Sequence, residues 1–175
     1  MLLIHKNLKI RNATADDAVQ LCEWWNDGRV MAHAGFPNGL DTNPEKIMRQ
    51  LSTDSDDTCR RLIIEVNNVS VGEMSFRNKG DGVAEIGIKI CKPDEQEKGH
   101  GSLFLRMLIS GLFSSGYDKI ILDTNLENTR AQHVYEKLGF LRLRTNYDSW
   151  KNQLGELQSS IDYELPKSNF VPIEF

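Results

Sequence analysis

Cysteine is scarce in this sequence: its 175 residues contain only three. Cys22, Cys59 and Cys91 are odd in number, lie far apart and form no C-x-x-C pair. This pattern argues against a disulfide framework and against a zinc site, so we expect no bound metal. Free thiols of this kind are typical of proteins in the reducing cytoplasm.

Long apolar runs and an excess of positive charge are missing as well. No segment approaches the run of about 20 apolar residues that crosses a membrane, and residues 1–12 lack the apolar core of a secretory signal. Lys and Arg number 21 against 25 Asp and Glu, whereas nucleic-acid binders normally show a basic excess. We therefore expect a cytoplasmic protein with neutral or cationic small partners, and with neither a membrane nor a nucleic acid among its partners.

Hydrophobic residues make up 39% of the chain, which is enough for a sizeable core. At this length, folding removes roughly two-thirds of the unfolded chain's surface from water. The sequence contains no internal repeat, low-complexity tract or linker. We therefore predict a single domain that spans residues 1–175.

The first third of the chain predicts one strand and two short helices. A strand at 8–11 is followed by Thr14, which begins a helix with Asp17 as its capping-box partner. A second helix is capped by Asn43 and opened by Pro44. Helical spacing predicts a buried stripe on each helix, formed by Ala15, Ala18, Val19, Cys22 and Trp25 in the first and by Ile47, Met48 and Leu51 in the second.

The middle of the chain predicts an antiparallel meander. Three strands are expected at 62–66, 69–76 and 83–91, because β-branched and apolar residues alternate there with polar ones. Asn and Gly residues predict tight turns between them at 67–68 and 79–82.

The second half changes to alternating helices and strands. A helix is expected at 101–114, a strand at 119–123 and a helix at 128–138, which ends at Gly139. A strand, a helix and a strand in this order imply a right-handed crossover and a parallel pair. Two further strands complete a mixed sheet in an α/β (α+β) fold, at 140–147 and 156–165.

A glycine-rich turn stands between the strand at 83–91 and the following helix, with the sequence QEKGHG at 96–101. Gly99 and Gly101 let the backbone turn tightly and approach a ligand, and the N–H groups at a helix start bind phosphate. A P-loop motif is missing, and Phe104 stands where a Rossmann fingerprint needs its third glycine. A turn that merely joins the strand to the helix is the remaining alternative.

A second motif follows at 128–140, with the sequence NTRAQHVYEKLGF. Together with EIGIKI at 85–90 and the Q-x-x-G-x-G turn, it resembles the GNAT acetyltransferases. It is most similar to the branch of ribosomal-protein alanine, spermidine and some aminoglycoside N-acetyltransferases. The resemblance covers about residues 83 to 141. It implies the GNAT fold, a mixed and mostly antiparallel sheet of six to seven strands that is splayed at a parallel pair and flanked by about four helices.

The resemblance also implies an activity. Acetyl-CoA would be the co-substrate, and a primary amine on a small molecule or a protein N-terminus would attack it directly in a ternary complex. The same fold also allows a non-catalytic acyl-CoA-binding or sensor domain, and a homodimer is possible. The loops at 26–43 and 147–155 would select the acceptor, and aromatic side chains would line its pocket, namely Trp25, Phe36, Tyr147 and Trp150.

The cofactor's pantetheine arm would lie between the strands at 83–91 and 119–125, paired with free backbone groups of the first strand. A backbone N–H near Ile90 would stabilise the oxyanion. The pyrophosphate would lie on the turn at 96–102, and Asn128 would bind the arm from the other side. The implied cofactor-binding residues are Lys89, Ile90, Cys91, Gln96, Glu97, Lys98, Gly99, His100, Gly101, Ser102, Asn128 and Arg130.

Three residues are candidates for proton transfer. Tyr135 lies on one helical face with Ala131 and Leu138, and its phenol stays protonated at pH 7, so it suits a general acid toward the departing thiolate. A core tyrosine with a backbone partner is the alternative. Glu85 or Glu73, both on the central strands, would take the amine's proton directly or through water. Carboxylates that simply face solvent are the alternative for both.

Overall fold

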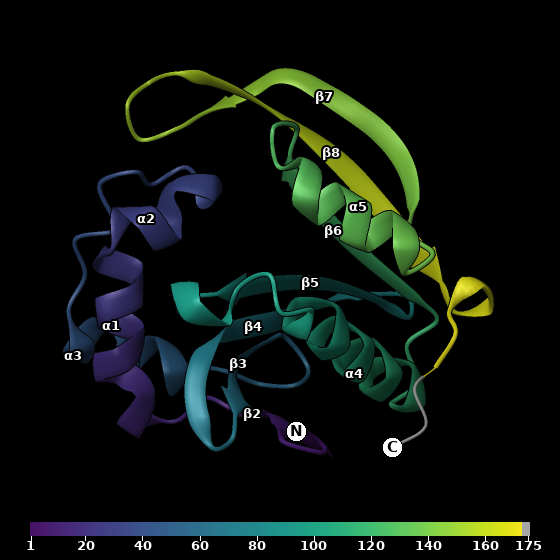
Figure 1. Ribbon diagram of the computed structural model, residues 1–175, viewed down its shortest axis with the longest axis horizontal. Helices are drawn as coiled ribbons and strands as arrows, with labels where there is room; N and C mark the ends of the chain where they lie inside the picture. The colour runs from purple at the N-terminus through teal and green to yellow at the C-terminus, as the bar shows by residue number, and fades with distance from the viewer. Residues whose placement is uncertain (173–175) are drawn as a thin grey trace.

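One mixed sheet organises the molecule (Figure 1). The computed structural model describes residues 1–172, and in this part of the chain eight strands lie in the order β1-β2-β3-β4-β5-β6-β8-β7. Every neighbouring pair is antiparallel except β5 and β6, which confirms the predicted mixed sheet with one parallel pair. The strands are β1 (Leu2–His5), β2 (Leu8–Asn12), β3 (Cys59–Val66), β4 (Val69–Gly80), β5 (Val83–Ile90), β6 (Lys119–Asn125), β7 (Leu141–Lys151) and β8 (Leu157–Pro166).

Helices cover both faces of this sheet. The α-helices within the described residues are α1 (Ala18–Asn26), α2 (Gly28–Met31), α3 (Pro44–Leu51), α4 (His100–Ser114) and α5 (Thr129–Lys137). Successive side chains of a strand point to opposite faces, so Leu62 and Ile64 of β3 pack in the cluster with α4. Ile63 between them packs against α1 and α3 instead. None of these helices is long and apolar enough to span a membrane.

Local chemistry explains several boundaries that the sequence predicted. Asn67 and Asn68 both adopt positive φ angles, 51° and 61°, in the tight turn between β3 and β4. The Asn43 side chain accepts a hydrogen bond from the Lys46 N–H at 2.9 Å and so caps α3. Gly139 ends α5 at a φ of 96°, the left-handed conformation that favours glycine.

Two parts of the first segment differ from the prediction. An additional edge strand, β1, pairs with β2 through a hairpin, so the sheet has one strand more than the six to seven expected. The buried stripe of α1 is also shifted: Ala15 and Val19 are exposed, and the buried residues are Ala18, Leu21 and Trp24. The shift has a physical cause, because the chain first makes a 3-10 turn at Ala15–Asp17 and α-helical spacing begins only at Ala18. In α3, Met48 of the predicted stripe is 40% exposed.

The parallel pair opens into a V. Its register joins Val83 to Lys119, Ala84 to Ile120 and Glu85 to Ile121, although β5 continues to Ile90 and β6 to Asn125. Beyond Glu85 the two strands therefore separate, as predicted for a sheet splayed at this pair. α4 follows β5 and α5 follows β6, so both helices begin at the open end of the V.

Candidate active site

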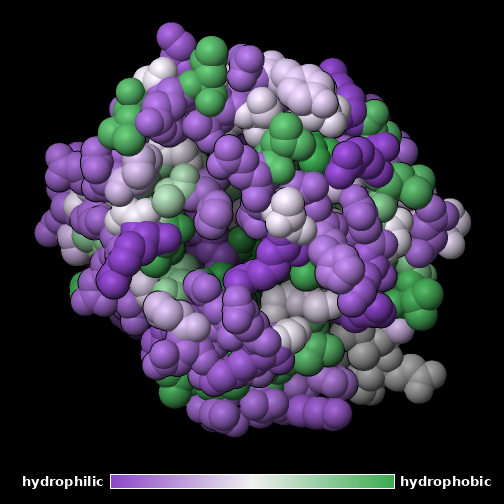
Figure 2. All heavy atoms as spheres, turned by 45° about the horizontal axis from the view of Figure 1, so that its top comes forward, coloured by the Kyte–Doolittle hydropathy of each residue, from purple (hydrophilic) through white to green (hydrophobic). Residues whose placement is uncertain are grey.

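Two cavities meet at the open end of the V. The first, the turn-side cavity, has a volume of about 500 Å³ and is lined by Ile90, Gln96, Gly101, Leu105 and the first turn of α5. The second, the sheet-side cavity, has a volume of about 600 Å³ and opens among mainly hydrophilic residues near the centre of Figure 2. Its walls include Trp25, Arg61, Glu73, Ser75, Gly87, Asp123 and Trp150. Residues that line both cavities are His33, Ala34, Ile88, Lys89, Asn128 and Tyr135.

The end of β5 presents one backbone N–H to the V. The Cys91 N–H donates to Val71 O of β4 at 2.8 Å, and the Lys89 carbonyl also points toward β4, beside Gly72. Because backbone groups alternate along a strand, the Ile90 N–H between them points away from β4 into the V. The Ile90 carbonyl already accepts a hydrogen bond from Gln96 Nε2 at 2.9 Å.

The resemblance implied free backbone groups on Lys89, Ile90 and Cys91, and the structure shows which of the N–H groups among them is occupied. Cys91 offers no free N–H, and its side chain is buried. Burial, together with the nearby Glu73 carboxylate, raises the pKa of the Cys91 thiol to about 12, so it stays protonated and unreactive. Lys89 lines both cavities; its carbonyl lies beside Gly72 of β4, and its Nζ reaches Glu73 in the wall of the sheet-side cavity.

The turn at 96–102 places a helix start beside the turn-side cavity. Gly99 caps α4 at a φ of 80°, and the amides of His100, Gly101 and Ser102 lie in the first turn, where no intrahelical acceptor exists. A Cβ on Gly101 would meet only Ile90 Cγ1, at 4.0 Å. Packing within the protein therefore does not require glycine at this position, and the missing side chain leaves space in the cavity instead.

The charged residues predicted for this turn are mostly paired with one another. Glu95 Oε1 lies 3.2 Å from Lys98 Nζ, and its Oε2 lies 3.2 Å from His100 Nδ1 without the alignment of a hydrogen bond. Glu97 pairs with Arg130 of α5 at 2.8 Å. Of these predicted residues, only Arg130 lines the turn-side cavity, so the side chains of Glu97, Lys98 and His100 do not reach it.

Asn128 lies at the start of α5 and lines both cavities. Its Oδ1 accepts a hydrogen bond from the Ala131 N–H at 3.2 Å and caps the helix. The side-chain amide therefore has its N–H donors left for a ligand.

Tyr135 lies where the two cavities join. Its ring packs between Phe140 and Tyr163, with centroid distances of 5.8 Å to each, and the residue is only 8% exposed. Within residues 1–172 its hydroxyl makes no hydrogen bond, so the alternative of a core tyrosine with a backbone partner does not hold. Burial, with the Asp123 carboxylate adding to it, raises the pKa of Tyr135 to about 12. The phenol therefore keeps its proton at neutral pH.

The two predicted bases differ in position. Glu73 is buried in the wall of the sheet-side cavity, where its Oε1 accepts from Trp25 Nε1 at 2.9 Å and from Lys89 Nζ at 3.0 Å. Glu85 lines neither cavity, and its Oε2 lies 3.1 Å from Lys79 Nζ. The structure therefore does not bring Glu85 to the site, because β5 carries it to the closed end of the V.

The sequence analysis missed Asp123. This residue of β6 lines the sheet-side cavity, and within residues 1–172 it forms no ion pair with a cation. The Asp123 side chain is exposed at the cavity, and partial desolvation there, followed by the carboxylates of Glu85 and Asp162, raises its pKa. The available signal was an acidic residue near the end of a short apolar strand, but its surroundings depend on strand pairing far away in the sequence.

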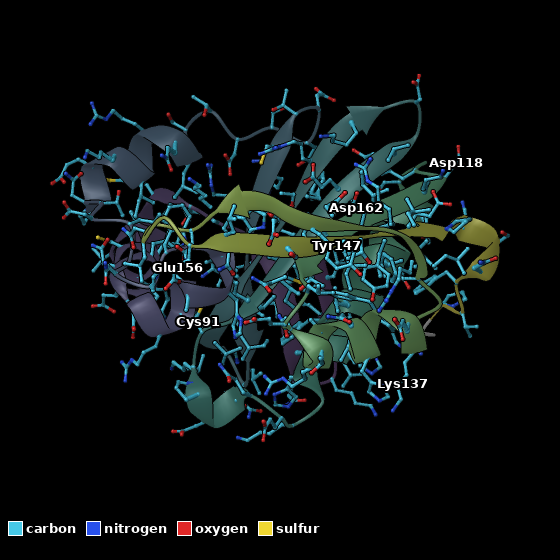
Figure 3. All side chains as sticks on the ribbon, turned by 90° about the horizontal axis from the view of Figure 1, so that it is seen from above. Cys91, Asp118, Lys137, Tyr147, Glu156 and Asp162 are labelled. Atoms are coloured by element: carbon cyan, nitrogen blue, oxygen red, sulfur yellow. The ribbon has the colours of Figure 1, made fainter. Side chains whose placement is uncertain are left out.

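The loops at 26–43 and 147–155 meet above the sheet-side cavity. Gln153 joins them, since its side chain accepts from the Asn38 N–H and donates to Gly39 O, both at 2.9 Å, and its backbone N–H donates to Gly35 O at 2.8 Å. Figure 3 shows the β7–β8 hairpin from above, with its turn, near Glu156, extending over the N-terminal helices. Among the aromatic candidates, Trp25 and Trp150 line the cavity, whereas Phe36 and Tyr147 do not.

No group of three His, Cys, Asp or Glu side chains within residues 1–172 is arranged to hold a metal ion.

Comparison with known proteins matches residues 7–141 to the family described as acetyltransferase (GNAT) domain. Solved structures resemble the chain over nearly its whole length. Spermidine N-acetyltransferase from Vibrio cholerae, in complex with CoA and spermine, is 20% identical, with 94% of this chain and 98% of that chain covered and a TM-score of 0.81. Ribosomal-protein-S5-alanine acetyltransferase from Vibrio fischeri is 15% identical, with 98% and 100% covered and a TM-score of 0.82. A GNAT-family acetyltransferase from Bacillus anthracis is 22% identical, with 96% and 99% covered and a TM-score of 0.78. At these identities the likeness shows a shared fold.

Proposed function

The chain belongs to the GNAT acetyltransferase family, and from this premise we propose that it transfers the acetyl group of acetyl-CoA to a primary amine by direct attack in a ternary complex. The observation that carries the proposal is the Tyr135 hydroxyl at the junction of two cavities, which has no hydrogen-bond partner in the described part of the chain. One cavity is suited to a phosphate-bearing donor and the other to an acceptor, so the two substrates would meet beside this phenol.

The turn-side cavity fits coenzyme A. The first-turn amides of α4 would hold the pyrophosphate, with Gly101 leaving room for it and Arg130 adding positive charge. The Ile90 N–H and the side-chain amide of Asn128 would hold the amide-rich arm from the two sides of the V. The bound acetyl-CoA supplies a thioester carbonyl that an amine can attack.

The sheet-side cavity would hold the acceptor. The central strands line it with a small polar residue, Ser75, and with Gly87, and the rings of Trp25 and Trp150 line it as well. Nothing on Gly87 fills the space, since a Cβ there would only touch Ser75 Oγ at 3.4 Å. A slender primary amine, on a small molecule or at a protein N-terminus, would fit such a site.

Tyr135 would act as the general acid. As the C–S bond of the donor breaks, the phenol O–H would donate its proton to the departing sulfur, since a free thiol has a pKa of only about 8.5 and leaves as a thiolate. The raised pKa of Tyr135 keeps this proton available throughout the neutral range. No nucleophilic side chain of the protein is needed in this scheme.

The test is acetyl-CoA turnover with a panel of amines. Thiol release would be measured with spermidine, a tetrapeptide with N-terminal alanine and an aminoglycoside, and calorimetry would measure coenzyme A binding separately. Thiol release that depends on one of the amines is the expected result. Tight coenzyme A binding without turnover on any amine would favour a non-catalytic acyl-CoA-binding or sensor domain instead.

A further inference from the structure

The carboxylate of Asp123 occupies an unfavourable position for stability alone. In the β6–β8 register Asp123 lies directly opposite Asp162, and like charges opposite each other destabilise a sheet. Asp162 is compensated by Arg144 Nε at 2.6 Å and by Asn146 Nδ2 at 3.0 Å. Asp123 has no such partner within residues 1–172.

The other charged side chains of the sheet-side cavity are already compensated. Glu73 is paired with Lys89, and Arg61 is paired with Asp54 and lies over the ring of Trp25. Of the Asp, Glu, Lys and Arg side chains that line this cavity, Asp123 has no partner of opposite charge within residues 1–172, so it is suited to bind a cationic group.

A second observation points to the same place. Tyr135 is only 8% exposed, its hydroxyl has no hydrogen-bond partner within residues 1–172, and it reaches the V from α5. Asp123 reaches the same V from β6, and the two groups interact electrostatically. A phenol that keeps its proton and a carboxylate that can accept one therefore flank the place where the two cavities join.

We propose that Asp123 binds the ammonium group of the acceptor and takes its proton, so that it is the base of the acetyl transfer. This assignment rests on the proposed function. Asp123 accepts one proton from the ammonium ion and leaves a neutral amine, whose lone pair forms the C–N bond with the acetyl carbon. The nitrogen loses a second proton to water as the C–S bond breaks, and the sulfur takes the proton of Tyr135. Tyr135 regains a proton from water and Asp123 releases its own, so one proton in total reaches the solvent.

The predicted bases are less suited to this step. Glu73 Oε1 already accepts two hydrogen bonds, from Trp25 and from Lys89, and these hold Glu73 as part of the cavity wall. Glu85 lies outside the cavity and is paired with Lys79. Its role toward Asp123 is that of a neighbouring negative charge.

The assignment has a pH signature. Asp123 interacts electrostatically with Tyr135 of α5, Glu85 of β5 and Asp162 of β8, and the two carboxylates favour its protonated form. A base works only when it is deprotonated, so kcat/KM should fall as the pH drops through the raised pKa of Asp123. Removing the charge of Asp162 should lower that pKa and move the acidic limb to lower pH.

The test compares Asp123→Asn with Asp162→Asn on whichever amine the wild type acetylates among spermidine, the N-terminal-alanine tetrapeptide and the aminoglycoside. We expect Asp123→Asn to lower kcat/KM by at least about a hundredfold and to remove the acidic limb, with coenzyme A affinity unchanged as evidence of folding. Asp162→Asn should keep the plateau kcat/KM and shift the limb to lower pH. If kcat/KM of Asp123→Asn lies within threefold of the wild-type value, or if the acidic limb of Asp162→Asn does not move, the assignment of Asp123 is overturned while the proposed function stands. A wild type that acetylates none of the three amines would overturn the proposed function and this assignment with it.

Discussion

The substitution Tyr135→Phe removes one hydroxyl and leaves the ring in place. The ring contacts with Phe140 and Tyr163 are retained. Because the hydroxyl makes no hydrogen bond within residues 1–172, its removal breaks no bond in the folded protein. The free energy of unfolding should therefore be nearly unchanged, since the hydroxyl borders the two cavities and loses no partner within the protein.

The kinetic effect should be large. Loss of a general acid typically lowers the rate by about 10²–10⁴-fold, which corresponds to about 3–5 kcal/mol of transition-state free energy. We expect kcat to fall by at least roughly tenfold, the low edge of what lost proton transfer explains, while coenzyme A affinity is retained. Stopped-flow or steady-state thiol release gives kcat, and calorimetry gives the affinity.

The matched control is Tyr163→Phe, a second buried tyrosine in the same aromatic cluster. Its hydroxyl donates to Glu136 Oε1 at 3.0 Å and lines neither cavity. This variant should lose about 1 kcal/mol of stability and keep its kcat. A wild-type kcat in Tyr135→Phe, or an equal loss in both variants, would refute the role of Tyr135 as the acid.

Three other substitutions test separate parts of the molecule. Gly101→Glu places a negative side chain in the turn-side cavity and should abolish coenzyme A binding in calorimetry; an unchanged affinity in a folded variant would show that the phosphates bind elsewhere. Gln153→Ala breaks the hydrogen bonds that join the two loops, so steady-state kinetics should show a higher KM for the amine at an unchanged coenzyme A affinity, and an unaltered KM would mean that these loops do not shape the acceptor site. Burial raises the pKa of Asp17, but hydrogen bonds from Arg11 and Thr14 outweigh this and lower it, so the charged carboxylate stabilises the fold above its ordinary pKa of about 3.9 and loses this effect in acid. Asp17→Asn should therefore lower the melting temperature at pH 7, with a difference from the wild type that shrinks toward pH 3; a constant difference would exclude the charge as its cause.

Features that depend on neighbouring residues could be predicted from the sequence. The caps at Asn43 and Gly139 and the turn at 67–68 follow from side-chain chemistry within a few positions. The parallel pair follows from the order of strand, helix and strand. The position of Tyr135 in the wall of both cavities agrees with its helical face.

Features that depend on distant residues could not be predicted in the same way. The strand β1 has exposed apolar side chains, Leu2 and Ile4, and so lacks the pattern of a half-buried strand. The surroundings of Asp123 depend on β8, about forty residues later, which places the carboxylate of Asp162 opposite it instead of a cationic side chain. The contact between the two loops beside the sheet-side cavity likewise depends on Gln153, which bonds to a loop more than a hundred residues earlier in the sequence.

The most direct test of the central claim is a single-turnover experiment on the whole chain. The protein would be loaded with labelled acetyl-CoA, mixed with an amine that supports turnover, and quenched at short times for mass spectrometry of both protein and amine. The expected result is one acetyl group on the amine for each bound acetyl-CoA, with no acetylated protein at any time and a much slower transfer in Asp123→Asn and Tyr135→Phe. A transient acetyl group on the protein would contradict direct transfer between the two cavities, and transfer at the wild-type rate in both variants would contradict the roles of Asp123 and Tyr135.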